Sequence, residues 1–299
     1  MNEKKLSPTG KPEWLKTSLP SGAVYFDIKK DLRARRLSTV CEEAKCPNIG
    51  ECWATNTATF MLLGDTCTRG CRFCHIKTDA APPHPDPDEP RNVAESCLTM
   101  KLKYVVMTMV NRDDLPDGGA AHIVRVVKKV HELNPGIIVE LLMGDFGGSE
   151  SALHQLFEVP MGVFAHNVET VERLSPRVRD ARANYKQSLE VLRRAKQIAP
   201  YPVFTKSAIM LGLGESYDEL VQTLHDLRAN DVDIVTMGQY MRPTKKHLSV
   251  KEWVRPEVFA QLGQVARDLG FRAVASAPLV RSSYKANEVY KQLSTTKGV

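Results

Sequence analysis

The residues most capable of metal or redox chemistry are concentrated in one short part of the chain. Six of the seven cysteines lie between Cys41 and Cys74. They form two sets of three, Cys41-x4-Cys46-x5-Cys52 and Cys67-x3-Cys71-x2-Cys74. An odd number of thiols within a set cannot be fully paired as disulfides. Closely spaced reduced cysteines are usually metal ligands or redox groups, whereas Cys97, alone in a predicted helix, is expected to be a small core residue.

Three thiolates favour an iron–sulfur cluster over the other thiolate centres. A structural zinc site closes with four ligands, usually from paired C-x2–4-C units, whereas three thiolates with an open fourth position suit a cluster. Zinc bound by Cys67, Cys71, Cys74 and His75 would require adjacent residues to chelate one ion. The sequence Cys71-x-x-Cys74-His75 also matches the haem-attachment pattern, but that chemistry belongs to exported proteins. Zinc and haem are the alternatives to a cluster.

The composition is that of an ordinary globular protein. Of the 299 residues, 25% are charged and 42% are hydrophobic, and the net charge is +6. This balance argues against a disordered chain and against a disulfide-dense scaffold. No apolar run approaches the roughly 20 residues of a membrane span, and Met1 to Pro20 lack the pattern of a signal or transit peptide. We therefore expect a cytoplasmic protein with reduced thiols and no membrane partner.

Strand-like and helix-like segments alternate after the first cysteine set. Short apolar, β-branched runs predict six buried strands, at 58–63, 104–110, 137–143, 162–166, 202–211 and 234–241. Apolar residues at helical spacing predict helices over 92–101, 120–133, 185–198, 217–229 and 258–269. This alternation implies a parallel sheet, either open and doubly wound or curved into a partial barrel. The second cysteine set follows the first strand, where an α/β barrel has its catalytic face.

The second cysteine set resembles the cluster motif of the radical S-adenosylmethionine (SAM) enzymes, and further motifs narrow the resemblance to the lipoyl synthase family. These are the first cysteine set, Cys67-Thr-Arg-Gly-Cys-Arg-Phe-Cys74, Asn111-Arg-Asp-Asp-Leu-Pro-Asp-Gly-Gly119, His166-Asn-Val-Glu-Thr170, Gly212-Leu-Gly-Glu215, Gly238-Gln-Tyr240 and Arg281-Ser-Ser-Tyr284. The resemblance implies a partial (β/α)6 barrel, of the TIM type, over residues 56–272. An N-terminal extension, 1–55, and a C-terminal extension, 273–299, would carry an auxiliary cluster.

The resemblance implies two [4Fe–4S] clusters and SAM as cofactors. One cluster would bind SAM and cleave it to a 5′-deoxyadenosyl radical, because unactivated methylene C–H bonds are too strong for acid–base chemistry. Its ligands would be Cys67, Cys71 and Cys74. The auxiliary cluster would donate its sulfides to the product. Its ligands would be Cys41, Cys46, Cys52 and Ser283.

Three further residues are expected to contact SAM. Asn167 and Glu169 follow the fourth predicted strand and offer groups suited to the ribose hydroxyls. Arg179 is expected at the SAM carboxylate. The structural alternatives are an acid favoured by a helix N-terminus for Glu169 and a solvated basic face for Arg179.

The substrate that the resemblance implies is an octanoyl group linked to a lysine of a lipoyl carrier domain. The carriers would be the E2 component of 2-oxo acid dehydrogenases and the H protein of glycine cleavage, with sulfur added at C6 and C8. An electron donor such as ferredoxin or flavodoxin is also expected. The basic stretch from Lys29 to Arg36 would steer an acidic carrier or form a solvated helix face. Since no nucleic-acid motif accompanies it, we expect no nucleic-acid partner. The alternative functions are sulfur insertion or methylthio transfer on RNA, and electron transfer by a two-cluster protein.

Several positions depart from the family pattern. Asn111 stands where an aspartate is usual, Ala208 and Ala277 replace glycines, and Gly144 precedes Asp145 where Pro-Asp is usual. We expect none of them to touch a cluster ligand, so that any effect falls on substrate preference.

Overall fold

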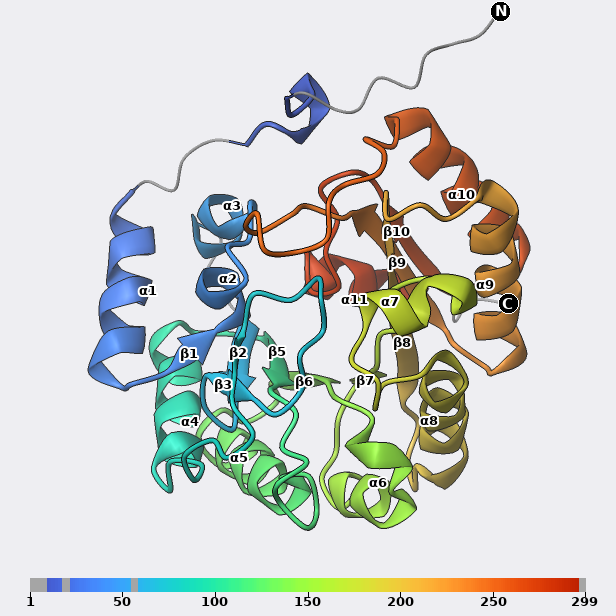
Figure 1. Cartoon of the computed structure of the whole chain (residues 1–299). Helices are drawn as coiled ribbons and strands as arrows, with labels where there is room; N and C mark the ends of the chain where they lie inside the picture. Colours follow the sequence, from blue (N-terminus) through green and yellow to red (C-terminus); the bar gives the residue numbers. More distant parts are fainter. Residues whose placement is uncertain (1–9, 18–21, 55–58, 296–299) are drawn as a thin grey trace, which may run out of the picture.

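A curved, mostly parallel sheet forms the centre of the molecule. The computed structural model describes residues 10–17, 22–54 and 59–295 (Figure 1). The strands of the sheet, in spatial order, are β1 (Ser38–Thr39), β2 (Thr59–Leu62), β5 (Tyr104–Met109), β6 (Ile138–Leu142), β7 (Val163–Ala165), β8 (Phe204–Leu211), β9 (Ile234–Gln239) and β10 (Ala273–Ser276). All neighbours pair in parallel except β1 and β2, which are antiparallel. The sheet does not close on itself, so the barrel is partial.

Helices follow most of the strands and cover the outside of the sheet (Figure 1). They are α4 (Glu89–Thr99), α5 (Ala120–Leu133), α6 (Glu150–Leu156), α7 (Ser175–Val178), α8 (Tyr185–Ile198), α9 (Tyr217–Ala229) and α10 (Pro256–Asp268). The last helix, α11 (Ala286–Thr295), packs against the inner face instead. Before the barrel lie α1 (Ala23–Ala34), α2 (Val40–Glu43) and α3 (Ile49–Ala54), and a separate pair of two-residue strands is formed by β3 (Thr66–Cys67) and β4 (Lys77–Thr78). Among the described residues, no helix is long and apolar enough to cross a membrane.

The predicted alternation of strands and helices is confirmed. The six predicted strands correspond to β2 and β5 to β9, with ends shifted by one or two residues; Ala58 lies outside the described residues. The helices α5, α8 and α9 have the predicted bounds. The prediction did not include β10, which adds a seventh parallel strand beside β9.

The core lies on both faces of the sheet. Alternate residues of β7 separate the two faces: Phe164 packs with the outer helices, whereas Val163 and Ala165 pack with Val289 and Leu293 of α11. This alternation is the two-residue period of a strand, and it places α11 against the inner face. Cys97 is fully buried in the outer core, as predicted.

Side-chain caps fix where several helices begin at the end of a loop. Asn184 accepts a hydrogen bond from the backbone N–H of Gln187 (2.8 Å) and starts α8. Ser216 and Glu219 form a reciprocal capping box at the start of α9. Each cap contributes about 1 kcal/mol to stability and sets where the loop before the helix ends. These loops form the carboxyl edge of the barrel.

Candidate active site

A cavity of about 640 Å³ lies at the carboxyl edge of the barrel. Loops that follow the parallel strands contribute to its wall, as do the segments before β2 and after β10. It brings together all the residues predicted for the site, namely Cys41, Cys46, Cys52, Cys67, Cys71, Cys74, Asn167, Glu169, Arg179 and Ser283. The parallel topology explains this convergence, because every strand ends at the same edge.

The Cys67–Cys74 loop directs backbone N–H groups at its sulfur atoms. Cys67 Sγ accepts from the N–H of Arg69 (3.4 Å) and of Asn111 (3.3 Å), and Cys71 Sγ accepts from the N–H of Asp180 (3.3 Å). Such hydrogen bonds favour the ionised thiolate that a metal requires. The expectation that Asn111 touches no ligand residue is therefore wrong, since its backbone contacts Cys67.

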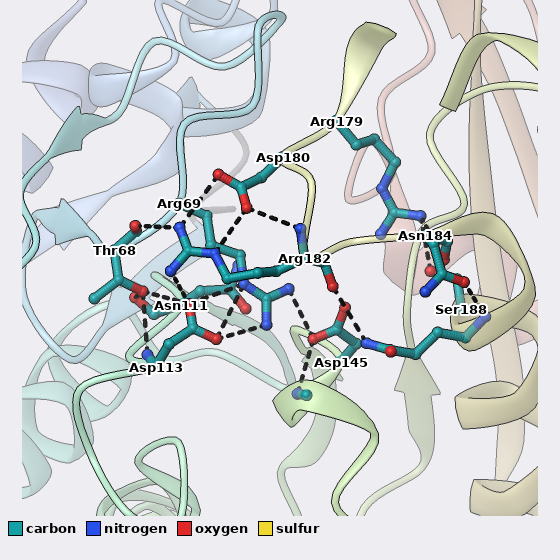
Figure 2. Close-up of polar contacts among 12 residues, drawn as sticks. Thr68, Arg69, Asn111, Asp113, Asp145, Arg179, Asp180, Arg182, Asn184 and Ser188 are labelled. Carbon is teal, nitrogen blue, oxygen red and sulfur yellow. Dashed lines mark hydrogen bonds and ion pairs between the residues drawn. The ribbon is translucent and has the colours of Figure 1, made fainter. Parts of the chain in front are cut away.

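The side chain of Arg69 ties this loop to two neighbouring strand ends (Figure 2). Its Nη2 lies 2.7 Å from Asp113 Oδ1, after β5, and its Nη1 lies 2.8 Å from Asp145 Oδ1, after β6. Only 2% of the Arg69 side chain and none of the Asp145 side chain is exposed. These two ion pairs therefore act in a poorly hydrated environment, where removing one partner is costly.

A second set of contacts in Figure 2 ties the same loop to the segment after α7. Asp180 accepts from the N–H of Gly70 (2.8 Å) and from Arg182 Nε (2.8 Å), and Arg182 Nη2 donates to the carbonyl of Thr68 (2.7 Å). The neighbouring cations hold the pKa of Asp113 and Asp180 below the usual range. For Asp180 the main cause is the hydrogen bond from Arg182. No spacing in the sequence predicts this network, because its members come from three separate loops.

The first cysteine set lies on two short helices above the barrel. Cys41 lies in α2 and is buried, Cys52 lies in α3, and Cys46 lies between the helices. The turn is closed by backbone hydrogen bonds from Cys46 N–H to the carbonyl of Cys41 (3.0 Å) and from Cys52 N–H to the carbonyl of Asn48 (2.9 Å). Asn48 Nδ2 in turn donates to the carbonyl of Leu279 (2.7 Å), which joins this segment to the chain after β10.

The chain after β10 reaches the cavity because position 238 lacks a side chain. A Cβ at Gly238 would lie 1.9 Å from the carbonyl oxygen of Val280. Beyond this crossing, Ser283 lines the cavity. Tyr284 donates its hydroxyl hydrogen to Glu51 (3.0 Å), and Lys285 Nζ lies 3.3 Å from Glu51 Oε1. The contacts with Glu51 dock Ser283 against the first cysteine set.

The cysteines of the two sets are thiols that must lose a proton before they bind metal. None of the seven cysteines, all of which lie in the described part of the chain, is in a disulfide. Burial raises the pKa of Cys41 and Cys71 to about 11 and that of Cys52 and Cys74 to about 12. The metal must therefore displace protons when it binds. Among the described residues, no three His, Cys, Asp or Glu side chains are placed to share one metal ion. In an iron–sulfur cluster each thiolate binds its own iron, and each set brings three thiols to the cavity wall.

The predicted SAM-contacting residues follow β7 and line the cavity beside the second cysteine set. Asn167 Nδ2 donates to Glu169 Oε1 (3.1 Å), while Asn167 Oδ1 is buried without a hydrogen-bond partner among the described residues. Burial raises the pKa of Glu169 and lowers that of Arg179. Arg179 Nη1 donates to Ser188 Oγ (2.8 Å). Unsatisfied buried groups of this kind are explained by a bound ligand, so this wall fits a polar molecule.

His166 supports this wall, a role that the sequence did not predict. Its Nδ1 lies 2.8 Å from the carbonyl of Met143, and its Nε2 lies 2.8 Å from Ser188 Oγ. A neutral ring satisfies both contacts: Nδ1–H donates to the carbonyl, and Nε2 accepts from Ser188, which accepts from Arg179. Burial, with Arg179 nearby, lowers the pKa of His166 to about 4.

Two of the departures from the family pattern are neighbours in space. A Cβ at Gly144 would lie 2.4 Å from Oδ1 of Asn111. A bulkier residue at position 144 would therefore require the Asn111 side chain to move. Both residues line the cavity.

Two histidines connect the second cysteine set to its surroundings. His75 Nδ1 lies 2.9 Å from the carbonyl of Glu43 in α2, and His247 Nε2 lies 2.9 Å from the carbonyl of Cys74. The two rings are 5.6 Å apart. His75 thus joins the two cysteine segments by its contact with the backbone of Glu43. The sequence did not predict this contact.

Two family models match segments of the chain. Residues 61–227 match the radical SAM superfamily, and residues 1–46 match the N-terminal domain of lipoyl synthase. The chain is 53% identical to lipoyl synthase 1, mitochondrial, of Pisum sativum and 57% identical to the mitochondrial lipoyl synthase of Phaeosphaeria nodorum. Each alignment covers 96% of this chain and 77% of the relative. Because these relatives are named mitochondrial, the prediction of a cytoplasmic protein is wrong.

Solved structures share the fold at low sequence identity. HydG, a maturase of the [FeFe]-hydrogenase, gives a TM-score of 0.59 at 14% identity and covers 83% of this chain and 65% of its own. Methylornithine synthase gives 0.55 at 14% identity, with 94% and 90% covered. The sheet and these neighbours confirm the predicted partial barrel. The sequence identities establish more than the fold: the chain belongs to the lipoyl synthase family, radical SAM sulfurtransferases whose cofactors are SAM and iron–sulfur clusters.

Proposed function

We propose that this chain carries out the family reaction with two cysteine sites that act on one shared cavity. The reaction inserts two sulfur atoms, at C6 and C8, into an octanoyl group on a carrier lysine. The observation that carries the proposal is the wall of the 640 Å³ cavity, which contains both cysteine sets, Ser283 and the polar wall after β7. A radical formed at one set can then act on a substrate held against the other without crossing solvent.

The second set, Cys67, Cys71 and Cys74, is proposed to hold the cluster that binds SAM. When bound, that cluster and SAM supply a 5′-deoxyadenosyl radical. The chain fixes the sulfur atoms by N–H···S bonds and by the buried Arg69 ion pairs. Holding reactive groups in a fixed geometry lowers the barrier to reaction.

Asn167, Glu169 and Arg179 are proposed to orient SAM. The buried Arg179 guanidinium, close to Cys71, suits the carboxylate that must lie beside this cluster. Asn167 and Glu169 offer oxygen acceptors that suit ribose hydroxyls. The unpaired Oδ1 of Asn167 would gain a donor when SAM binds.

The first set, Cys41, Cys46 and Cys52, is proposed to hold the auxiliary cluster with Ser283 as the fourth ligand. A hydroxyl oxygen matches iron–sulfur chemistry less well than a thiolate, so Ser283 can leave while the three thiolates remain. In this arrangement residues 1–55 and 273–299 serve as extensions that complete the site on the barrel of 56–272.

The remaining partners are proposed from the same reaction. The octanoylated carriers are the E2 component of 2-oxo acid dehydrogenases and the H protein of glycine cleavage. An electron donor such as ferredoxin or flavodoxin would supply the electron for SAM cleavage.

Ser283→Ala tests the proposal against the matched variant Ser282→Ala, since both serines line the cavity. Each protein is reconstituted without oxygen and given SAM, dithionite and an octanoyl-lysyl peptide. We expect Ser283→Ala to form 5′-deoxyadenosine but little dithiolated peptide, and Ser282→Ala to form both. Undiminished dithiolation by Ser283→Ala would remove this residue from the ligand set. Absence of both products with the wild-type chain would contradict the function itself.

A further inference from the structure

Five exposed cationic side chains lie together at one side of the cavity mouth. They come from three segments: the Cys67–Cys74 loop, α7, and the loop between β9 and α10. They are Arg72, Arg177, Arg242, Lys245 and Lys246. We call them the basic rim. Arg242 itself lines the cavity, so the group borders the entrance rather than a distant surface.

Hydrogen bonds to backbone carbonyls hold the three segments side by side. Arg72 Nη1 donates to the carbonyl of Arg177 (3.4 Å), and the N–H of Leu248 donates to the carbonyl of Arg72 (3.3 Å). Arg242 Nε donates to the carbonyl of His247 (2.9 Å), and a second Arg242 nitrogen donates to the carbonyl of Lys245. These contacts use carbonyl oxygens, so they position the cations without neutralising their charge.

The charges of the basic rim are unpaired. Across residues 10–17, 22–54 and 59–295, no carboxylate forms an ion pair with any of the five side chains. Like charges gathered at an entrance repel one another and raise the local positive potential. This repulsion does not stabilise the fold, so we infer that the five cations serve a function.

The basic stretch from Lys29 to Arg36 differs in this respect. Arg35 lies 2.8 Å from Asp31, Arg36 lies 3.2 Å from Asp86, and Arg33 lies 3.8 Å from Glu42. Three of the five cations between Lys29 and Arg36 are therefore paired with carboxylates. The sequence predicted either a surface that steers an acidic carrier or a solvated helix face for this stretch, and its partial neutralisation favours the solvated face.

We propose that the basic rim is the docking surface for an acidic face of the octanoylated carrier domain. The inference rests on the proposed function and deepens it. The octanoyl-lysine arm must enter the cavity, so the carrier must lie over the mouth while the arm reacts. An acidic face would pair with the five cations there, which speeds encounter and fixes orientation more than it adds affinity at close range.

The test separates docking from chemistry by using two substrates. The reconstituted holoenzyme is given either an acidic octanoylated carrier domain or a short octanoyl-lysyl peptide, with dithionite as reductant. Lys245→Glu/Lys246→Glu reverses two charges of the rim. Lys29→Glu/Lys30→Glu makes the same change of net charge on α1 and is the matched control.

We expect the rim variant to lose about tenfold or more in kcat/KM for the carrier, chiefly through KM, because steering of this kind changes association rates by ten to a thousandfold. Its kcat/KM for the peptide should be unchanged. The α1 control should match the wild type with both substrates. Added salt should reduce the wild-type advantage for the carrier. Binding of the carrier without SAM, which does not depend on turnover, should weaken in parallel.

Three results would overturn the proposal. Equal losses with carrier and peptide would assign the rim to the cavity itself, and equal losses in both variants would assign the effect to net charge. If only turnover driven by flavodoxin or ferredoxin suffers, and dithionite restores it, the rim serves the electron donor. Dithiolation of the peptide by the wild-type enzyme reports on the proposed function alone, so the two failures are distinguishable.

Discussion

The two cysteine sets face one cavity, yet the chain supports them in different ways. The Cys67–Cys74 loop follows β2, the first parallel strand of the barrel, and is fixed by buried ion pairs through Arg69. The Cys41–Cys52 segment lies on two short helices and is completed from the other end of the chain by contacts with Glu51, which is exposed. One site is therefore part of the barrel, and the other is assembled on it.

This difference matches the use that we propose for each site. A cluster that serves in every turnover benefits from a rigid mount, because each displacement of the bound cofactor raises the barrier to reaction. A cluster that gives up its sulfides must be dismantled and replaced. Exposed ion pairs contribute only about 0 to 1 kcal/mol each, so the contacts of Glu51 with Tyr284 and Lys285 can open at little cost.

The largest expected effect comes from removing one thiol at each site. Cys71→Ala should abolish both 5′-deoxyadenosine and dithiolated product, because no radical forms. Cys46→Ala should abolish dithiolation but retain SAM cleavage, because it disables only the sulfur donor. Each variant should also lose about half of the bound iron, measured by iron and sulfide analysis. If Cys46→Ala abolished SAM cleavage as well, the two sites would not be separable in the way that their supports suggest.

A smaller effect is expected when the buried and the exposed ion pairs around the Cys67–Cys74 loop are broken separately. Arg69→Met leaves Asp145 buried without its charge partner, and breaking a buried pair in this way costs about 3–5 kcal/mol. Arg182→Met removes a half-exposed guanidinium from the same network and should cost about 0 to 1 kcal/mol. Chemical denaturation of both variants measures the difference. Equal, small losses would show that the loop is not held by the Arg69 pairs.

The sequence predicted the parts of the molecule that are repeated or patterned. Apolar spacing predicted α5, α8 and α9 with their bounds, since each has one buried face and a clear cap or break. It missed β10, because a four-residue strand at the edge of the sheet is too short to show a pattern. It missed the roles of Arg69 and Asp145, because ion pairs between loops have no periodicity. Family motifs supplied Ser283, which composition and spacing could not.

The unpaired rim was missed for a related reason. Sequence alone directs attention to charges that are consecutive, as in Lys29 to Arg36, but neutralisation depends on acids brought near by the fold. Arg72 and Arg242 are far apart in the chain and gather only because loops after different strands meet at one edge. Charge in the sequence therefore predicts a surface less well than unpaired charge in the structure.

The last prediction concerns acid and the wall behind the second cysteine set. His166 has a pKa of about 4 in the folded chain, below its ordinary value of 6.5, because burial disfavours the charged ring. Between these values the unfolded chain binds a proton that the folded chain does not, so stability falls as the pH drops from about 6.5 to 4 and this group has no further effect below that. At about 1.4 kcal/mol per pH unit, the loss is about 3 kcal/mol.

His166→Gln cannot take up this proton. Its free energy of unfolding, measured on the full chain before cluster reconstitution, should depend less steeply on pH over this range than that of the wild type. Parallel curves would mean that His166 does not carry the acid sensitivity. A shallower curve would show that mild acid destabilises the wall beside the second cysteine set through His166. The effect would reach Arg179 through Ser188, which both side chains contact.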